Sequence, residues 1–232
     1  MLKDLRKQVC EANRDLERYR LLTLTWGNAS GIDRTKGLVV IKPSGVAYAN
    51  LTPDKLVVLD LEGKTVEGRL NPSSDAPTHL VLYRAFASIG GIAHTHSTHA
   101  TSFAQACRAI PCLGTTQADH FYGPVPVTRR MTTREVRGDY EANTGRVIVE
   151  RFAKLSPIEM PGVLVANHGP FTWGKDAAEA VKNSVILEAV AQMALGTYAL
   201  APGIRAIQPS LLDKHFQRKH GPSAYYGQKP SR

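Results

Sequence analysis

The chain has few cysteines, and their arrangement argues against a fold held together by disulfides. Cys10, Cys107 and Cys112 are odd in number, and none of them forms a Cys-x-x-Cys pair. Small secreted domains that depend on disulfides carry an even, dense set of cysteines. We therefore expect a protein of a reducing compartment, the cytoplasm.

Long hydrophobic runs are also missing. No stretch reaches the roughly 18 consecutive apolar residues typical of a membrane-spanning helix. The N-terminal segment MLKDLRKQVCEANRDLERYR carries charges throughout, whereas a signal peptide has an uninterrupted apolar centre. These absences predict a cytoplasmic protein with no membrane partner.

Nucleotide and nucleic-acid signatures are absent. The chain contains neither GxGxxG nor GxxxxGK[ST], which disfavours a nucleotide-binding fold. Its formal net charge of +9 would suit an anionic partner. The basic residues are dispersed, however, and no helix-turn-helix, RNP or zinc-finger signature accompanies them, so we expect no nucleic-acid partner. The charge fits small phosphorylated metabolites, or simply a soluble basic surface.

The pattern of the chain predicts one α/β domain over residues 1–232. Hydrophobic residues make up 43% of the sequence, enough for an ordinary core. Because hairpins are mixed with helices, we predict a mainly antiparallel central sheet flanked by helices. Strands are expected in residues 21–30, 37–45, 55–61, 64–70, 91–97 and 162–169, with a turn over 31–37. Helices are expected in residues 1–20, 76–89, 98–109, 132–153, 176–200 and 210–220.

Two apolar segments carry histidines at their ends. His94 and His96 are two residues apart, so on a strand both point to the same face. His168 ends an independent apolar segment, and Gly169-Pro170 is expected to form a sharp turn after it. Taken singly, each histidine is as well explained by a structural hydrogen bond. Together they favour a catalytic zinc site with an open coordination position.

Three short turns carry small or basic residues after apolar strands. They are Trp26-Gly27-Asn28, Lys42-Pro43-Ser44-Gly45 and Pro72-Ser73-Ser74. Such turns are common individually, but the last one opens a helix, whose free N–H groups favour an anion. In a chain with a metal site they indicate a phosphorylated substrate. Asp75, which follows the third turn, fits a fourth metal ligand and a helix N-cap equally well.

The whole set of motifs resembles the L-ribulose-5-phosphate 4-epimerase family of the class II aldolase and adducin-like superfamily. The resemblance extends from Met1 to Gln228. The segments that carry it, in order, are LTLTWGNAS, VIKPSGVAY, NPSSDAPTH, GGIAHTHSTHAT, GTTQADHFYG, PGVLVANHGPFTWGKDAAEAV, LLDKHFQRKHG and AYYGQ.

The resemblance implies a role for named residues. The expected metal site, with one Zn²⁺ per subunit or another divalent ion such as Mn²⁺, consists of His94, His96 and His168 with Asp75 close by. The expected phosphate site consists of Gly27, Asn28, Ser44, Gly45, Ser73 and Ser74, with Lys42 adjacent. The expected acid/base residues are Asp119 and Tyr226, on opposite sides of the substrate. Further residues expected around the site are Thr115, Glu141, His215 and Arg218.

The resemblance also implies an assembly and a reaction. The expected assembly is a cyclic homotetramer with active sites between subunits, in which a tail of about residues 222–232 carries Tyr226 into a neighbouring site. The expected reaction interconverts L-ribulose 5-phosphate and D-xylulose 5-phosphate by cleaving C3–C4, turning the aldehyde and rejoining the bond. Such a reaction fits carbohydrate pathways that begin from arabinose, ascorbate or another sugar.

Two alternatives compete with the epimerase hypothesis. A class II aldolase would share the metal but release the aldehyde, and such aldolases have glutamate at the position of Asp75. A non-catalytic adducin-like interaction module would lack the metal histidines. The chain also departs from the family pattern at Gln117 and His120, where histidine and tyrosine are expected, and at Asn167, where serine is common.

Overall fold

A seven-stranded sheet forms the centre of the computed structural model, which describes residues 2–225. In chain order its strands are β1 (Gly27–Asp33), β2 (Leu38–Ile41), β3 (Val57–Asp60), β4 (Thr65–Glu67), β5 (Gly91–Thr95), β6 (Gly162–Leu164) and β7 (Pro170–Gly174). Their order across the sheet is β4-β3-β2-β1-β5-β7-β6, and every neighbouring pair of these strands is antiparallel. The predicted α/β fold with an antiparallel central sheet is confirmed.

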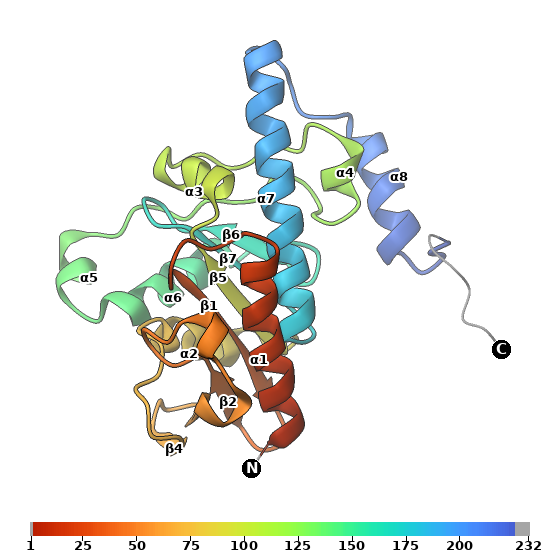
Figure 1. Cartoon of the computed structure of the whole chain (residues 1–232). Coiled ribbons are helices and arrows are strands. Elements are labelled where there is room, and N and C mark those ends of the chain that lie inside the picture. Colours follow the sequence, from red (N-terminus) through yellow and green to blue (C-terminus); the bar gives the residue numbers. More distant parts are fainter. Residues whose placement is uncertain (1, 226–232) are drawn as a thin grey trace.

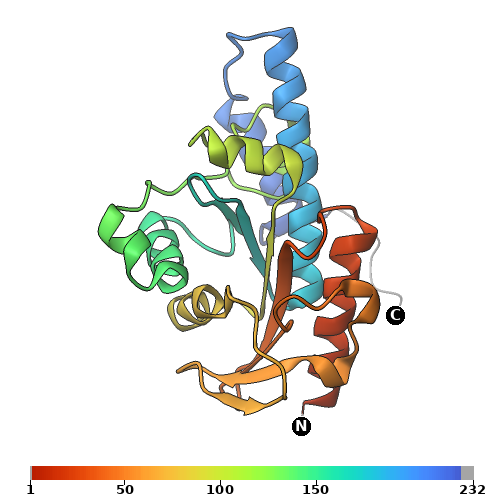
Figure 2. The same ribbon diagram turned by 60° about the vertical axis from the view of Figure 1, so that its left-hand side comes forward.

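Helices cover both faces of this sheet (Figures 1 and 2). The long α7 packs beside α1 on one face, and α2 packs against α6 on the other. The helices are α1 (Lys3–Arg18), α2 (Ala76–Ala85), α3 (Thr98–Gln105), α4 (Thr115–Ala118), α5 (Thr133–Arg137), α6 (Tyr140–Arg151), α7 (Ala177–Leu200) and α8 (Pro209–His220). Two short 3₁₀ turns, Tyr48–Asn50 and Pro53–Lys55, lie between β2 and β3. Within residues 2–225, no helix has both the length and the hydrophobicity needed to cross a bilayer.

The alternation of side chains along the strands divides the core into two layers. Val40 and Val58 join the cluster under α1, whereas Val39 and Leu59 join the cluster under α2. Successive residues of a strand point to opposite faces, so both faces of the sheet are buried. This explains why β2 and β3 have continuous apolar sequences rather than alternating ones.

The first strand begins later than predicted. Residues 21–26 form no strand, and β1 takes up the first part of the predicted turn, as far as Asp33. Leu24 is exposed with a φ of 54°, whereas polar Ser30 is fully buried and its hydroxyl lies 2.7 Å from His79 Nδ1. Hydrophobicity alone favoured the apolar run, but the buried strand is the one whose polar side chains have partners inside the protein.

A second difference concerns the segment after His168. Residues 170–174, predicted to follow a turn, form the interior strand β7 between β5 and β6. Pro170 stands at its first position, where a missing N–H is tolerated. The turn instead lies at residues 165–169, closed by hydrogen bonds between Val165 N and Gly169 O and between His168 N and Val165 O.

The predicted helix starts are partly confirmed. The side chain of Asp176 accepts a hydrogen bond from Glu179 N, and Thr132 with Glu135 forms a complete capping box. The single helix predicted over residues 132–153 is in fact two, because α5 ends at its C-cap Gly138 and α6 begins at Tyr140.

Candidate metal centre and phosphate-binding cavity

The pairing of β1 with β5 brings the predicted turn Trp26-Gly27-Asn28 beside the histidines, although Gly27 and Asn28 in fact begin strand β1. Asn28 pairs with His94, and Gly27 pairs with Thr95. Gly27 has a φ of 131°, and a Cβ at this position would lie 2.7 Å from the backbone oxygen of His94. Only glycine fits such a conformation and such a close approach. The turn and the histidine segment therefore meet backbone to backbone.

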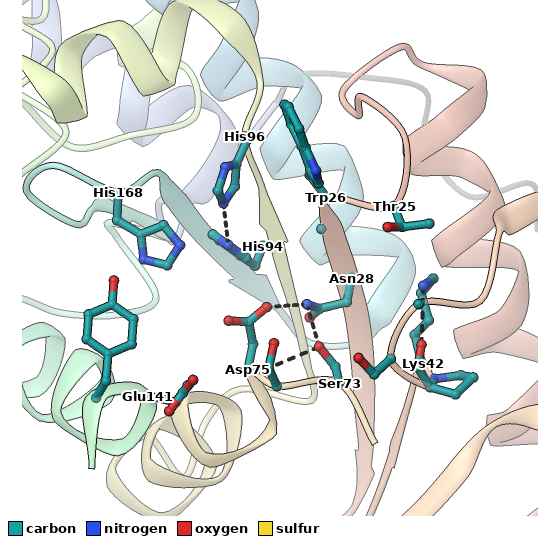
Figure 3. A pocket seen from close by; sticks show the side chains of 16 residues that line it. Thr25, Trp26, Asn28, Lys42, Ser73, Asp75, His94, His96, Glu141 and His168 are labelled. Carbon is teal, nitrogen blue, oxygen red and sulfur yellow. Dashed lines mark hydrogen bonds between the residues drawn. The ribbon is translucent and has the colours of Figure 1, made fainter. Parts of the chain in front are cut away.

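Three histidines converge at this end of the sheet (Figure 3). His94 lies within β5, His96 follows the strand directly, and His168 lies in the β6–β7 turn. One nitrogen of each ring lies within 4.8 Å of the other two, and the Nε2 atoms of His94 and His96 are 3.1 Å apart. Pairing of β5 with β7, with Phe171 opposite His94, brings the two distant segments together.

The His94 ring is held from two sides. Its Nδ1 lies 2.9 Å from Pro170 O, so the N–H donates to this carbonyl and Nε2 is left as the lone-pair nitrogen. Phe171 stacks on the ring with centroids 4.1 Å apart. This is the arrangement by which proteins orient a metal-binding imidazole.

The protonation state of the site also fits a metal. Burial, and then the neighbouring His94 and His96, lower the pKa of His168 to about 3. Burial likewise lowers the pKa of His96. In the part of the chain that the structure describes, His168 Nδ1 is a buried nitrogen without a hydrogen-bond partner. Buried imidazoles whose protonation is disfavoured, and whose nitrogens converge, form a donor set suited to zinc.

Asp75 lies beside the histidines and does not cap α2. It occupies the N-cap position, but its side chain makes no capping hydrogen bond, so of the two alternatives the capping one is contradicted. Its Oδ2 accepts instead from Asn28 Nδ2 at 2.7 Å. Burial opposes its ionised form, but the nearby His94 and His79 and the hydrogen bond from Asn28 outweigh this and lower its pKa. A charged carboxylate thus faces the three rings.

A cavity of about 540 Å³ joins these histidines to all three turns. Asn28 links its two ends, because Nδ2 also donates to Ser73 Oγ at 3.0 Å (Figure 3). The predicted residues that line the cavity are Gly27, Asn28, Lys42, Ser44, Gly45, Ser73, Ser74, Asp75, His94, His96, Glu141 and His168. Trp26 and Pro43, which belong to the predicted turns but were given no role, also line the cavity. Lining residues that the sequence did not indicate are Thr25 and Tyr140, whose only signal is that they adjoin Trp26 and Glu141.

The second and third turns are joined by backbone hydrogen bonds. Ser44 N donates to Asn71 O, and Ser73 N donates to Lys42 O, each at 3.0 Å. The turns therefore form one rigid wall. Helix α2 begins directly after it, but the N–H groups of Asp75 and Ala76 already donate to Ser73 and Pro77 has none, so the side chains of the wall supply its polar groups.

Lys42 supplies the positive charge of this wall. Its side chain is only 2% exposed, and Nζ lies 4.8 Å from the centre of the Tyr48 ring. Burial lowers its pKa to about 8. The lysine is thus charged at neutral pH and close to losing that charge in mild alkali.

The remaining predicted residues gather elsewhere in the chain. Asp119 follows α4, and α8 packs against α4 (Figure 1). Arg218 donates two hydrogen bonds to the Asp119 carboxylate, at 3.0 and 2.7 Å, and His215 Nδ1 lies 3.1 Å from it. Partial burial opposes ionisation of Asp119, but these hydrogen bonds outweigh it and lower the pKa. Thr115 begins α4.

This Asp119 cluster does not line the cavity that holds the histidines. Within the described chain the predicted site residues therefore fall into two groups. Tyr226 lies outside the described residues.

The positions that depart from the family pattern have structural partners. The Gln117 amide donates to Ile110 O at 3.3 Å and to Gly123 O at 3.0 Å, which ties the loop before Asp119 together. Burial lowers the pKa of His120 to about 4, and its ring lies 3.5 Å from Lys219 Nζ. Asn167 adopts a φ of 63°, a left-handed conformation that asparagine tolerates better than most residues.

Known proteins resemble this chain over almost its whole length. The Class II Aldolase and Adducin N-terminal domain family matches residues 7–195. The L-ribulose-5-phosphate 4-epimerases UlaF of Salmonella paratyphi A and Salmonella typhi are each 57% identical over 228 residues, which cover 98% of this chain and all of theirs. The structure of an L-fuculose 1-phosphate aldolase matches with a TM-score of 0.77 and 25% identity over 91% of this chain and 94% of that one. An L-fuculose-1-phosphate aldolase of Thermus thermophilus matches with a TM-score of 0.67 and 25% identity over 88% of this chain and 98% of that one.

Replacing one histidine tests the metal site. We expect His94→Ala to lose most of the zinc that the wild-type protein retains after dialysis, because a three-imidazole site loses its most buried ligand. His215→Ala is the matched control, since it removes a histidine of the Asp119 cluster and should keep its zinc. The measurement is the metal content per chain, determined by atomic emission. An unchanged zinc content in His94→Ala would contradict the proposed three-histidine site.

Proposed function

Because the chain belongs to the class II aldolase and adducin family, we propose that it is an L-ribulose-5-phosphate 4-epimerase, converting L-ribulose 5-phosphate to D-xylulose 5-phosphate and back. The observation that carries the proposal is the single cavity with three imidazoles at one end and a lysine-bearing phosphate wall at the other. A phosphorylated ketose has a carbonyl and a phosphate at separate positions along its chain. The relatives that bear this name support the choice of substrate.

The substrate determines the kind of chemistry that is needed. The hydrogen on C4 of a 2-ketose is not acidic, so simple deprotonation cannot invert that carbon. Breaking the C3–C4 bond can, because it leaves an enediolate and glycolaldehyde phosphate. The aldehyde then presents its other face, and the bond forms again with inverted configuration.

The residues of the cavity would bind and hold the two fragments. A zinc ion, or another divalent ion, held by His94, His96 and His168 would act as the Lewis acid that polarises the C2 carbonyl. Ser44, Ser73 and Lys42 would retain the phosphate of the aldehyde fragment. Retention matters, because an aldehyde that leaves before the bond reforms gives cleavage instead of epimerisation.

Proton transfer would require the second group of residues. One group must remove the proton of the C4 hydroxyl, and another must protonate the new alkoxide from the opposite side. We assign these roles to Asp119 and Tyr226. The lowered pKa of Asp119 keeps it ionised at neutral pH, which is the form that can accept a proton, although the same shift makes it a weaker base. Thr115, Glu141, His215 and Arg218 would complete the surroundings.

The separation of the Asp119 cluster from the cavity supports an assembly with shared sites. In a cyclic homotetramer each cavity can face the Asp119 cluster of a neighbouring subunit, and the tail from about residue 222 can bring Tyr226 there. The distal part of α7 offers apolar surface for such contacts: Met193 is 54% exposed and Leu200 is 90% exposed.

A class II aldolase is the second candidate, and Asp75 weighs against it. The aldolases of this superfamily are expected to have a longer glutamate here as base. Asp75 is shorter and is held back by Asn28 at 2.7 Å, so it is less able to protonate the enediolate. An unprotonated enediolate stays ready to recombine, which favours epimerisation. The non-catalytic alternative is disfavoured, because all three histidines are present and converge.

A product assay tests the proposed reaction. Purified zinc-loaded protein is incubated with L-ribulose 5-phosphate, and xylulose 5-phosphate and free glycolaldehyde phosphate are followed separately. We expect the epimer with little free aldehyde. Stoichiometric aldehyde without the epimer would contradict the epimerase proposal and support the aldolase.

The pKa of Lys42 predicts a pH dependence. Lysine is charged below its pKa, so the phosphate is attracted below about pH 8 and the attraction is lost above it. We expect kcat/KM to fall by up to about tenfold per pH unit above this value. Lys42→Met should have a lower kcat/KM at pH 7 and should lack this decline. An equal decline in Lys42→Met would assign it to another group.

Mixed assemblies test whether sites are shared. His94→Ala and Asp119→Asn should each be nearly inactive alone. When the two are unfolded together and refolded, about a quarter of the sites in a cyclic tetramer should combine an intact His94 with an intact Asp119 from the next subunit. Activity should therefore recover. Each variant refolded alone is the control, and no recovery in the mixture would place the complete site within one chain.

A further inference from the structure

A partly buried glutamate of α7, Glu188, caps a different helix, α3. Helix α3 begins directly after Ser97, whose side chain makes no capping hydrogen bond. Glu188 Oε1 accepts from His99 N, and Oε2 accepts from Ala100 N, each at 2.9 Å. Oε1 also lies 2.6 Å from His99 Nδ1. One carboxylate thus satisfies two of the N–H groups that a helix start leaves free.

The carboxylate is charged and partly buried. Its side chain is 17% exposed. Burial opposes ionisation, but the amides of Ala100 and His99 outweigh this and lower the pKa of Glu188. A negative charge at the positive end of a helix dipole holds that end in place more firmly than a neutral acceptor would.

Of the two histidines in the β5 segment, His96 is the nearer to this cap. Strand β5 ends at Thr95, so His96 lies one residue beyond the last paired position. His94, by contrast, is fixed within the strand and by Pro170 O. On its other side His96 is followed at once by Ser97, the N-cap of α3. The backbone of His96 is therefore clamped between the edge of β5 and the capped start of α3.

We propose that Glu188 is a positioning residue for the metal site: by fixing the N-terminus of α3 it holds His96 at the place where its ring meets His94 and His168. The inference rests on the proposed metal function of the three histidines. It assigns a role in metal affinity to a residue that is neither one of the three converging histidines nor part of the cavity lining.

The experiment compares two glutamates of α7. Glu188→Gln keeps the size of the side chain but turns an NH₂ group toward one of the two backbone amides. We expect zinc affinity, measured by chelator competition, to fall by about 10- to 100-fold. Glu179→Gln is the matched control, because Glu179 also lies on α7 and accepts from a backbone amide, that of Lys175, at 2.8 Å. Its zinc affinity should stay at the wild-type value.

Hydrogen exchange in the metal-free proteins tests whether Glu188 acts through the N-terminus of α3. The amides of His99 and Ala100 should exchange faster in Glu188→Gln than in wild type. If zinc affinity falls but the amides of His99 and Ala100 do not exchange faster, then Glu188 does not act by fixing the start of α3. Folded Glu188→Gln with wild-type affinity, or an equal loss in Glu179→Gln, would overturn the positioning role alone. Absence of zinc binding by the wild-type protein would remove the metal site and this inference together.

Discussion

The antiparallel pairing of β1 with β5 is the interaction on which the site depends. It fixes Asn28 opposite His94, so the residue that bridges Ser73 and Asp75 stands next to the imidazoles. Neither strand forms a complete site by itself. The histidines alone would lack the proposed phosphate wall, and the wall alone would lack the proposed metal ion. The five residue pairs between β1 and β5 place the histidines and the turns in one cavity, whose two ends differ in chemistry.

The charges near the site are arranged in two environments of opposite character. In the cavity, burial keeps His96 and His168 neutral and weakens the hold of Lys42 on its proton. At Asp119 the neighbouring Arg218 instead stabilises the ionised carboxylate. The proposed metal binding would use the first environment, and the proposed proton transfer would use the second.

Much of the site could be predicted from local sequence, and the rest could not. The spacing of His94 and His96 predicted that both rings meet, although His96 lies just beyond β5, and most residues of the three predicted turns line the cavity, although Gly27 and Asn28 lie in β1. Strand β7 was missed, because a five-residue segment that begins with proline becomes a strand only through its neighbours. Glu188 gave no signal at all: it lies 88 residues from an amide that it caps, and nothing in a helical pattern marks such a contact.

The close contact at Gly27 also bears on how such a protein can evolve. With the carbonyl of His94 only 2.7 Å from where a Cβ would be, Gly27 admits no side chain unless the β1–β5 pair shifts. The rim of the cavity is less constrained, because Trp26 borders the cavity and is 52% exposed. Substitutions of Trp26 can therefore change what enters the cavity, while the backbone beside the three histidines stays the same.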